Sequence, residues 1–153
     1  MEIKSSAFKH NEIIPSNYTC DGGNISPPLL WNEIPENTKS LALIADDPDA
    51  PVGTWTHWVI YNMPPTSKGL QEGVLPVQSF SHDTKQGIND FQQIGYGGPC
   101  PPSGIHRYFF KLYALNTKLN LESGATKEQL LMAMKGHILA QGETVGKYRK
   151  GRH

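Results

Sequence analysis

Apolar residues in this chain occur in short runs, separated by turns rich in Gly, Pro, Asn and Asp. Runs of this length that contain many β-branched and aromatic residues are typical of β-strands. The clearest are residues 39–45, 54–63 and 105–115, and the last of these has the strongest strand pattern. Residues 29–31 and 138–148 predict two further strands, the second interrupted by glycines.

Alternation within a strand assigns successive side chains to opposite faces of a sheet. In the strand predicted around His57, alternation places His57 on the face of Val59 and opposite Trp58. In the last of the three clear strands, it places His106 on the face of Tyr108. Each histidine therefore lies near the start of a strand that follows a loop dense in turn residues.

Only one helix has a clear signal. Thr126 is an N-cap residue and Gln129 lies three positions later, which together form a capping box. Gly136 is a stop signal. The apolar stripe of this helix consists of Leu130, Leu131 and Met134.

Many strands and a single clear helix favour a mostly β fold, with two packed antiparallel sheets and one or two peripheral helices. The length of 153 residues predicts a single domain over residues 1–153, with a core that needs no metal or disulfide. Residues 66–93 are weakly patterned, and we expect a long excursion with little regular structure there.

Composition narrows the class of partner. Lys plus Arg and Asp plus Glu both number 14, so the net charge is zero and gives no case for a nucleic-acid partner. No apolar run approaches the roughly 20 residues of a transmembrane helix, and the N-terminal residues lack the apolar core of a signal peptide. We therefore expect a soluble cytoplasmic protein without an integral membrane segment. The apolar edges of a small sandwich would allow a homodimer.

The two cysteines, Cys20 and Cys100, fit neither a zinc-ligand spacing nor a Cys-x-x-Cys redox motif. In the cytosol we expect two free thiols. A disulfide between them stays open as an alternative, since both lie in Gly- and Pro-rich loops that could meet.

Three carboxylates, those of Asp46, Asp47 and Asp49, follow the apolar run 39–45 directly. Acids this dense are costly to bury unless they are paired or hydrogen-bonded, and His57 is the nearest candidate partner. We expect Asp46 to be a strand-end or turn residue that faces solvent. The spacing is not that of an EF-hand calcium loop, so no metal or other cofactor is predicted.

His57 and His106 each follow a dense loop. Taken alone, each is more simply a core or turn histidine. If the two loops lie at the same end of the sandwich, both imidazoles meet a carboxylate, which would raise the histidine pKa by favouring the cation. Backbone N–H groups of Gly97 and Gly98 would add donors. Such a pocket suits a small anion such as phosphate.

Two motifs in the right order resemble the phosphatidylethanolamine-binding protein family, also called the Raf kinase inhibitor protein family. They are Asp47-Pro48-Asp49-Ala50-Pro51 followed by His57-Trp58, and Gly104-Ile105-His106-Arg107-Tyr108. The bacterial and archaeal branch of the family is the more similar one, because it also carries segments like Tyr18–Gly22 and Gly97–Pro102. The resemblance runs over nearly the whole chain.

This resemblance implies a β-sandwich and a pocket for phosphate-type headgroups. It also implies a cis peptide bond between Ala50 and Pro51, which an X-Pro bond allows at low cost. Arg107 alternates away from His106, and we expect it to brace a carboxylate behind the pocket, with Asp49 as the candidate. Carried over residue by residue, the ligand-binding residues would be Asp47, Asp49, Pro51, Trp55, His57, Gly98, Cys100, His106 and Tyr108.

Two functions compete. The first is a binding protein for a small phosphorylated or carboxylated ligand, which regulates a kinase or protease through the rim of its pocket. The alternative is a hydrolase with an Asp–His pair as general base and Cys100 as nucleophile. The Gly-x-Ser-x-Gly nucleophile motif is absent from the sequence, and we favour the binding protein.

Overall fold

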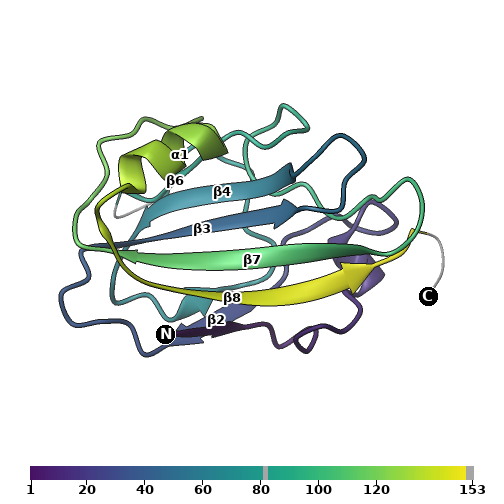
Figure 1. The fold of residues 1–153 in the computed structure, drawn as a ribbon, viewed down its shortest axis with the longest axis horizontal. Helices are drawn as coiled ribbons and strands as arrows, with labels where there is room; N and C mark the ends of the chain where they lie inside the picture. Colours follow the sequence, from purple (N-terminus) through teal and green to yellow (C-terminus); the bar gives the residue numbers. More distant parts are fainter. Residues whose placement is uncertain (81–82, 151–153) are drawn as a thin grey trace.

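A computed structural model describes residues 1–80 and 83–150 as two antiparallel sheets with one α-helix (Figure 1). The smaller sheet contains β1 (Glu2–Lys4), β2 (Leu29–Asn32) and β5 (Gly69–Leu70), in the order β1-β2-β5. A 3-10 turn, η1 (Ser16–Tyr18), lies between β1 and β2. The predicted fold class is confirmed.

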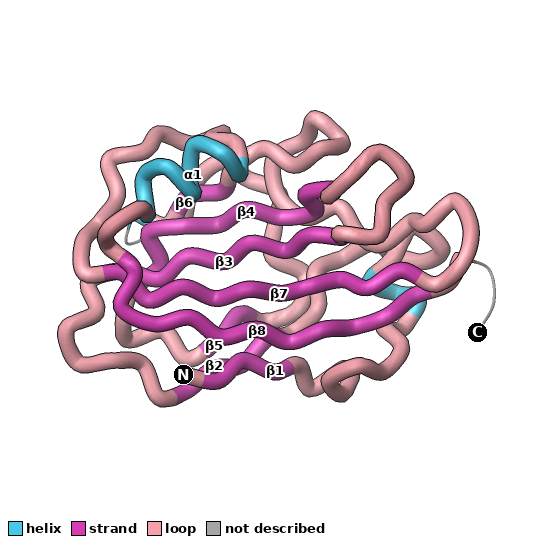
Figure 2. The backbone as a smooth tube through the Cα atoms, in the orientation of Figure 1, coloured by secondary structure: helices cyan, strands magenta, loops and turns pink. Residues whose placement is uncertain are grey.

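The larger sheet has the order β6-β4-β3-β7-β8, with all pairs antiparallel. Figure 2 shows its long strands running side by side across the molecule, with the smaller sheet behind them. Its members are β3 (Ser40–Asp47), β4 (Trp55–Met63), β6 (Lys85–Gln86), β7 (His106–Leu115) and β8 (Ile138–Tyr148).

The central strand β3 is buried on both faces, which explains why its sequence is apolar almost throughout rather than alternating. Leu41 and Leu43 pack in a core between the two sheets. Ile44 packs on the opposite face, in a second core closed by Leu130 and Met134 of α1 (Lys127–Met134).

The helix begins and ends as predicted. The Oγ1 atom of Thr126 accepts from the backbone N–H of Gln129 at 3.1 Å, and Oε1 of Gln129 accepts from the backbone N–H of Thr126 at 3.0 Å. Gly136, at φ 81°, follows the last turn in the left-handed conformation that glycine favours. Leu131 is 41% exposed, so the apolar stripe is narrower than the sequence suggested.

Asp46 does not face solvent, as the sequence analysis expected. It is 1% exposed, and its Oδ2 atom lies 2.7 Å from Nζ of Lys127 and 3.3 Å from Nζ of Lys111. Alternation along β3 points Asp46 toward α1 and Asp47 toward the smaller sheet. Two lysines therefore neutralise the carboxylate that the fold buries beneath the helix.

No peptide bond in the described residues is cis, so the expected cis bond between Ala50 and Pro51 is wrong. Within the same residues, no helix is long and apolar enough to cross a membrane.

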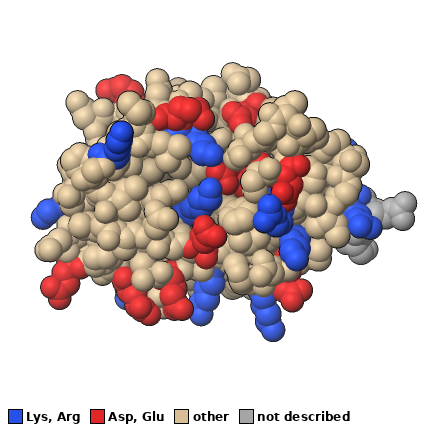
Figure 3. All heavy atoms as spheres, viewed as in Figure 1, with Lys and Arg blue, Asp and Glu red and all other residues tan. Residues whose placement is uncertain are grey.

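On the face in Figure 3, acidic and basic side chains are interspersed, with no continuous patch of one sign among the residues described. In the described part of the excursion at residues 66–93, the only strands are the two-residue β5 and β6.

Candidate functional site

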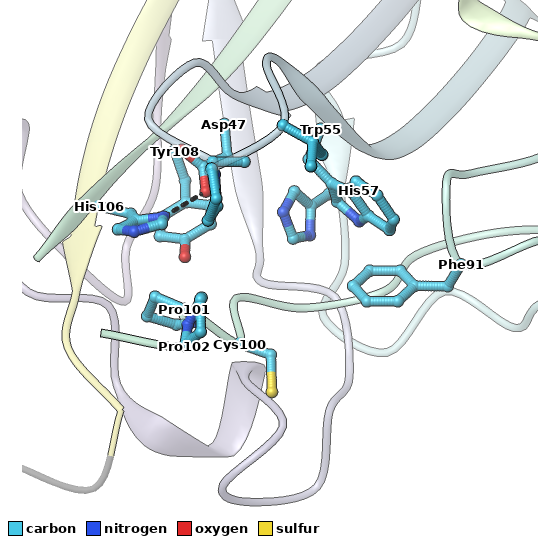
Figure 4. A pocket seen from close by; sticks show the side chains of 12 residues that line it. Asp47, Trp55, His57, Phe91, Cys100, Pro101, Pro102, His106 and Tyr108 are labelled. Carbon is cyan, nitrogen blue, oxygen red and sulfur yellow. Dashed lines mark hydrogen bonds and ion pairs between the residues drawn. The ribbon is translucent and has the colours of Figure 1, made fainter. Parts of the chain in front are cut away.

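A pocket of about 250 Å³ lies where β3 ends and β4 and β7 begin. The antiparallel order of these strands brings the β3–β4 loop beside the loop that precedes β7. Figure 4 shows the pocket between these loops. Its walls consist of Asp47, Ala50, Pro51, Val52, Trp55, His57, Phe91, Cys100, Pro101, Pro102, His106 and Tyr108.

Asp47 and His106 form a buried pair in this wall. Nδ1 of His106 lies 2.7 Å from Oδ2 of Asp47, and the two groups make an ion pair when the imidazole is protonated. The other carboxylate oxygen accepts the backbone N–H of Asp49 at 2.7 Å. Asp47 is 3% exposed and His106 7%, so the geometry of the pair is fixed by packing as well as by these hydrogen bonds.

A β-bulge directs His57 toward the pocket. Trp58 pairs with Ala45 and Thr56 pairs with Asp46, which leaves His57 as the extra residue between them. Its ring then packs against Tyr108, a residue of the core between the sheets, with 5.2 Å between ring centroids. The alternation that placed His57 with Val59 is therefore wrong, because regular alternation stops at the bulge.

Burial favours the neutral form of the His57 imidazole. Its Nδ1 lies 2.6 Å from the carbonyl oxygen of Gly97. Burial lowers the pKa of His57, and this outweighs the carbonyl and the carboxylates of Asp47, Asp46 and Asp90, which act in the opposite direction. The expected rise in the pKa of this histidine is wrong, because desolvation is the larger effect.

Two buried polar atoms of the wall have no hydrogen-bond partner in the described residues: the hydroxyl of Tyr108 and Nε1 of Trp55. Burial also raises the pKa of Tyr108, with Asp47 and Asp49 adding to the effect, so the hydroxyl keeps its proton. Figure 4 shows this hydroxyl between the imidazoles of His57 and His106. A buried donor without a partner is costly, and a bound oxygen atom would satisfy it.

The pocket floor is tied to the N-terminal part of the chain. Cys100 forms a disulfide with Cys20, and no cysteine is free, so the expected free thiols are wrong. The sulfur of Cys100 points away from the pocket in Figure 4. Because a disulfide sulfur is not a thiolate, Cys100 cannot be the nucleophile of the alternative hydrolase in this state.

Gly98 does not line the pocket. Its N–H donates to Oδ1 of Asn24 at 2.8 Å, and the N–H of Gly97 donates to the carbonyl of His57 at 2.9 Å, so neither is available to an anion. A Cβ atom on Gly98 would lie 2.4 Å from both Asn24 and the carbonyl oxygen of Tyr18. Glycine is required here for close packing of two loops.

Asp49 lies behind the wall, paired with Arg107 as expected. Its carboxylate accepts from Nε at 2.9 Å, from Nη2 at 2.8 Å and from the backbone N–H of Arg107 at 2.9 Å. These hydrogen bonds lower the pKa of Asp49 to about 2. The pair fastens the β3–β4 loop to the start of β7 and so holds Asp47 beside His106.

Phe91 is the wall residue that sequence reasoning missed most clearly. It lies in the weakly patterned excursion, and its ring meets His57 and Trp55 edge-on at 5.4 and 5.5 Å. Asp90 fixes the segment, because it accepts the backbone N–H of Thr56 at 2.6 Å. These contacts form between distant segments, and no local pattern signals them. Val52, Pro101 and Pro102 complete the apolar part of the wall.

The arrangement suits binding of a small polar group under an apolar rim. The pocket volume is below the roughly 300–1,000 Å³ of typical small-molecule sites. The described residues contain no cluster of three or more His, Cys, Asp or Glu that could hold a metal ion. The polar atoms of the wall that no described protein group occupies are Nε2 of His57, Nε2 of His106, the hydroxyl of Tyr108 and Nε1 of Trp55.

The chain is similar to known proteins over nearly its whole length. A family model described as phosphatidylethanolamine-binding protein matches residues 4–149. A UPF0098 protein of Methanothermobacter thermautotrophicus is 57% identical over 151 residues, covering 99% of this chain and 100% of the relative. A UPF0098 protein of Aquifex aeolicus is 51% identical, covering 98% of this chain and 89% of the relative.

Two solved structures are similar throughout. One is a phosphatidylethanolamine-binding protein homologue, CT736, from Chlamydia trachomatis, with a TM-score of 0.90, 45% identity and 97% coverage of both chains. The other is YbcL from E. coli, described as a new member of the mammalian family, with a TM-score of 0.88, 33% identity and 97% coverage of both chains.

Proposed function

This chain belongs to the phosphatidylethanolamine-binding protein family, and from that premise we propose that its pocket binds a small phosphorylated or carboxylated anion and that occupancy regulates a protein partner. Membership of the family supports a small-ligand-binding protein. The nature of the ligand and the regulation of a kinase or protease are the proposal.

The observation that carries the proposal is the unpartnered hydroxyl of Tyr108 between two imidazoles. His106 can add an N–H from Nε2 when its ring is protonated, since Nδ1 already faces Asp47. Donors that converge without protein acceptors favour an oxygen-rich anion. The small volume limits the bound part to a headgroup-sized moiety.

The rim is the part of the site that a protein partner could contact. Val52 is 84% exposed at the tip of the β3–β4 loop, and Phe91 is 39% exposed on the facing segment. Exposed apolar side chains around a polar pocket favour recognition of a charged group carried on a larger surface. A kinase or protease that docks on this rim would be prevented from binding while a free anion occupies the pocket.

Binding is favoured over catalysis. The disulfide removes Cys100 as a nucleophile, and an Asp–His pair without that thiol suits ligand orientation better than hydrolysis. A cytoplasmic location stays a prediction, and the Cys20–Cys100 disulfide counts against a reducing compartment. A homodimer likewise stays a prediction.

Titration with inorganic phosphate and with phosphoethanolamine, followed through the ring resonances of His57 and His106, tests the proposal. We expect saturable shifts for both rings in the wild type, and loss of the His106 shift in His57→Ala. His137 pairs with Asn116 outside the pocket, so His137→Ala is the matched control and should bind like the wild type. Saturation that persists in His57→Ala, or the absence of any shift with either anion, would contradict the proposal.

A further inference from the structure

His57 offers the pocket an acceptor. A carbonyl oxygen can only accept, so the 2.6 Å contact with Gly97 assigns the ring proton to Nδ1. The ring is 4% exposed and lies edge-on against Tyr108 and Phe91. In a neutral ring protonated at Nδ1, Nε2 carries a lone pair. No group in the described part of the chain donates to it.

The charges around His57 are consistent with a neutral ring. The acids that act on it are Asp47, Asp46 and Asp90. Asp47 is committed to His106, Asp46 to two lysines, and Asp90 to the backbone of Thr56. Desolvation outweighs their attraction for a proton, and the pKa of His57 is lowered.

The other polar atoms of the wall are donors. Nε1 of Trp55 can only donate, and the hydroxyl of Tyr108 donates to an oxygen that has no proton. Nε2 of His106 donates when that ring is protonated. When His106 is protonated, the pocket therefore combines several donors with one acceptor, and a ligand that satisfies all of them needs both bare oxygens and one O–H group.

We infer that the pocket selects phosphomonoesters in their singly protonated form over phosphodiesters. This inference rests on the proposed function and specifies its ligand. A monoester monoanion gives bare oxygens to Tyr108 and His106 and donates its P–OH to Nε2 of His57. A diester has the same single charge but no O–H, so its oxygens would face the lone pair of His57. A dianion would add a second negative charge beside the Asp47 carboxylate.

The test compares methyl phosphate with dimethyl phosphate, two probes of similar size, by calorimetry at about pH 6, near the second pKa of phosphate esters. An unsatisfied buried acceptor costs about 1–3 kcal/mol, so we expect the diester to bind roughly 5- to 150-fold more weakly. In His57→Gln the side-chain amide can present either a donor or an acceptor, and the ratio should fall close to one. His137→Gln is the matched control and should keep the wild-type ratio.

The outcomes separate this inference from the proposed function. Equal affinity of the two probes would overturn the inference and leave anion binding intact, whereas binding of neither probe would overturn both. The wild-type protein gives a second measurement that does not depend on a variant folding. In nitrogen-15 spectra of the methyl phosphate complex, we expect the His57 ring to be protonated at Nδ1 alone, and a doubly protonated ring would overturn the inference.

Discussion

The Cys20–Cys100 disulfide should contribute a large share of the stability of this protein. It joins residues 80 positions apart in the sequence. Closing a loop of that length in the unfolded chain removes about 15 cal/mol/K of entropy, which corresponds to about 4.5 kcal/mol at 25 °C. For a chain of this size, losing that stabilisation by breaking the disulfide should lower the melting temperature by roughly 9–18 °C.

The assay is urea unfolding followed by tryptophan fluorescence, with the oxidised protein, the reduced protein and Cys20→Ser/Cys100→Ser side by side. The reduced protein and the double variant should agree with each other, because the loss lies in the unfolded chain rather than in side-chain packing. Both should also unfold with a steeper denaturant dependence, since the open unfolded chain exposes more surface.

Ligand affinity should fall together with stability, because Cys100, Pro101 and Pro102 form the pocket floor. Each backbone residue that must be reordered costs about 1–2 kcal/mol, or roughly tenfold in affinity. The reasoning would be refuted if the reduced protein unfolded at the same urea concentration as the oxidised one. Titration of two free thiols in the native protein purified without reductant would also refute it.

Replacing Arg107 by Gln should return the pKa of Asp49 from about 2 toward its ordinary value of 3.8, because the charged hydrogen bonds that lower it are lost; carboxyl NMR titration measures this, and an unchanged pKa would contradict it. Burial lowers the pKa of His57 below 6.5, so the unfolded chain takes up a proton before the folded one does. Stability should therefore fall as the pH drops from about 7.5 to about 5, and the fall should be smaller in His57→Gln. Urea midpoints that decrease equally with pH in the wild type and in His57→Gln would be evidence against a buried neutral ring. Gly146→Ala would place a Cβ atom 2.5 Å from a buried isoleucine and should cost about 1–3 kcal/mol, whereas Gly23→Ala, with its nearest neighbour at 3.5 Å, should be nearly neutral; equal melting temperatures would refute the packing argument.

Long patterned segments could be predicted from the sequence because their signals are local. The apolar run that became β3, the aromatic run that became β7 and the capping box of α1 each contain their own evidence. The two-residue strands β5 and β6 were not predicted, because two residues are too few to show an alternating pattern of apolar and polar side chains.

Most residues of the candidate site could also be predicted from the sequence, because the motifs around Asp47, His57 and His106 contain them. Phe91 was not, because its role comes from packing against residues more than thirty positions away. Gly98 was placed in the site on the strength of its motif, while its N–H donates to Asn24 on another loop.

The sequence by itself determined where the long strands and the helix lie along the chain, and most of the candidate residues of the pocket, because propensity and apolar periodicity act over a few neighbouring residues. Only the tertiary structure decided which atoms face the pocket. A bulge opposite Ala45 turned His57 toward Tyr108, strand pairing buried Asp46 between two lysines, and loop packing joined Cys20 to Cys100. The physical reason is that burial, charge pairing and covalent cross-linking depend on partners brought together across the chain, which no local pattern encodes.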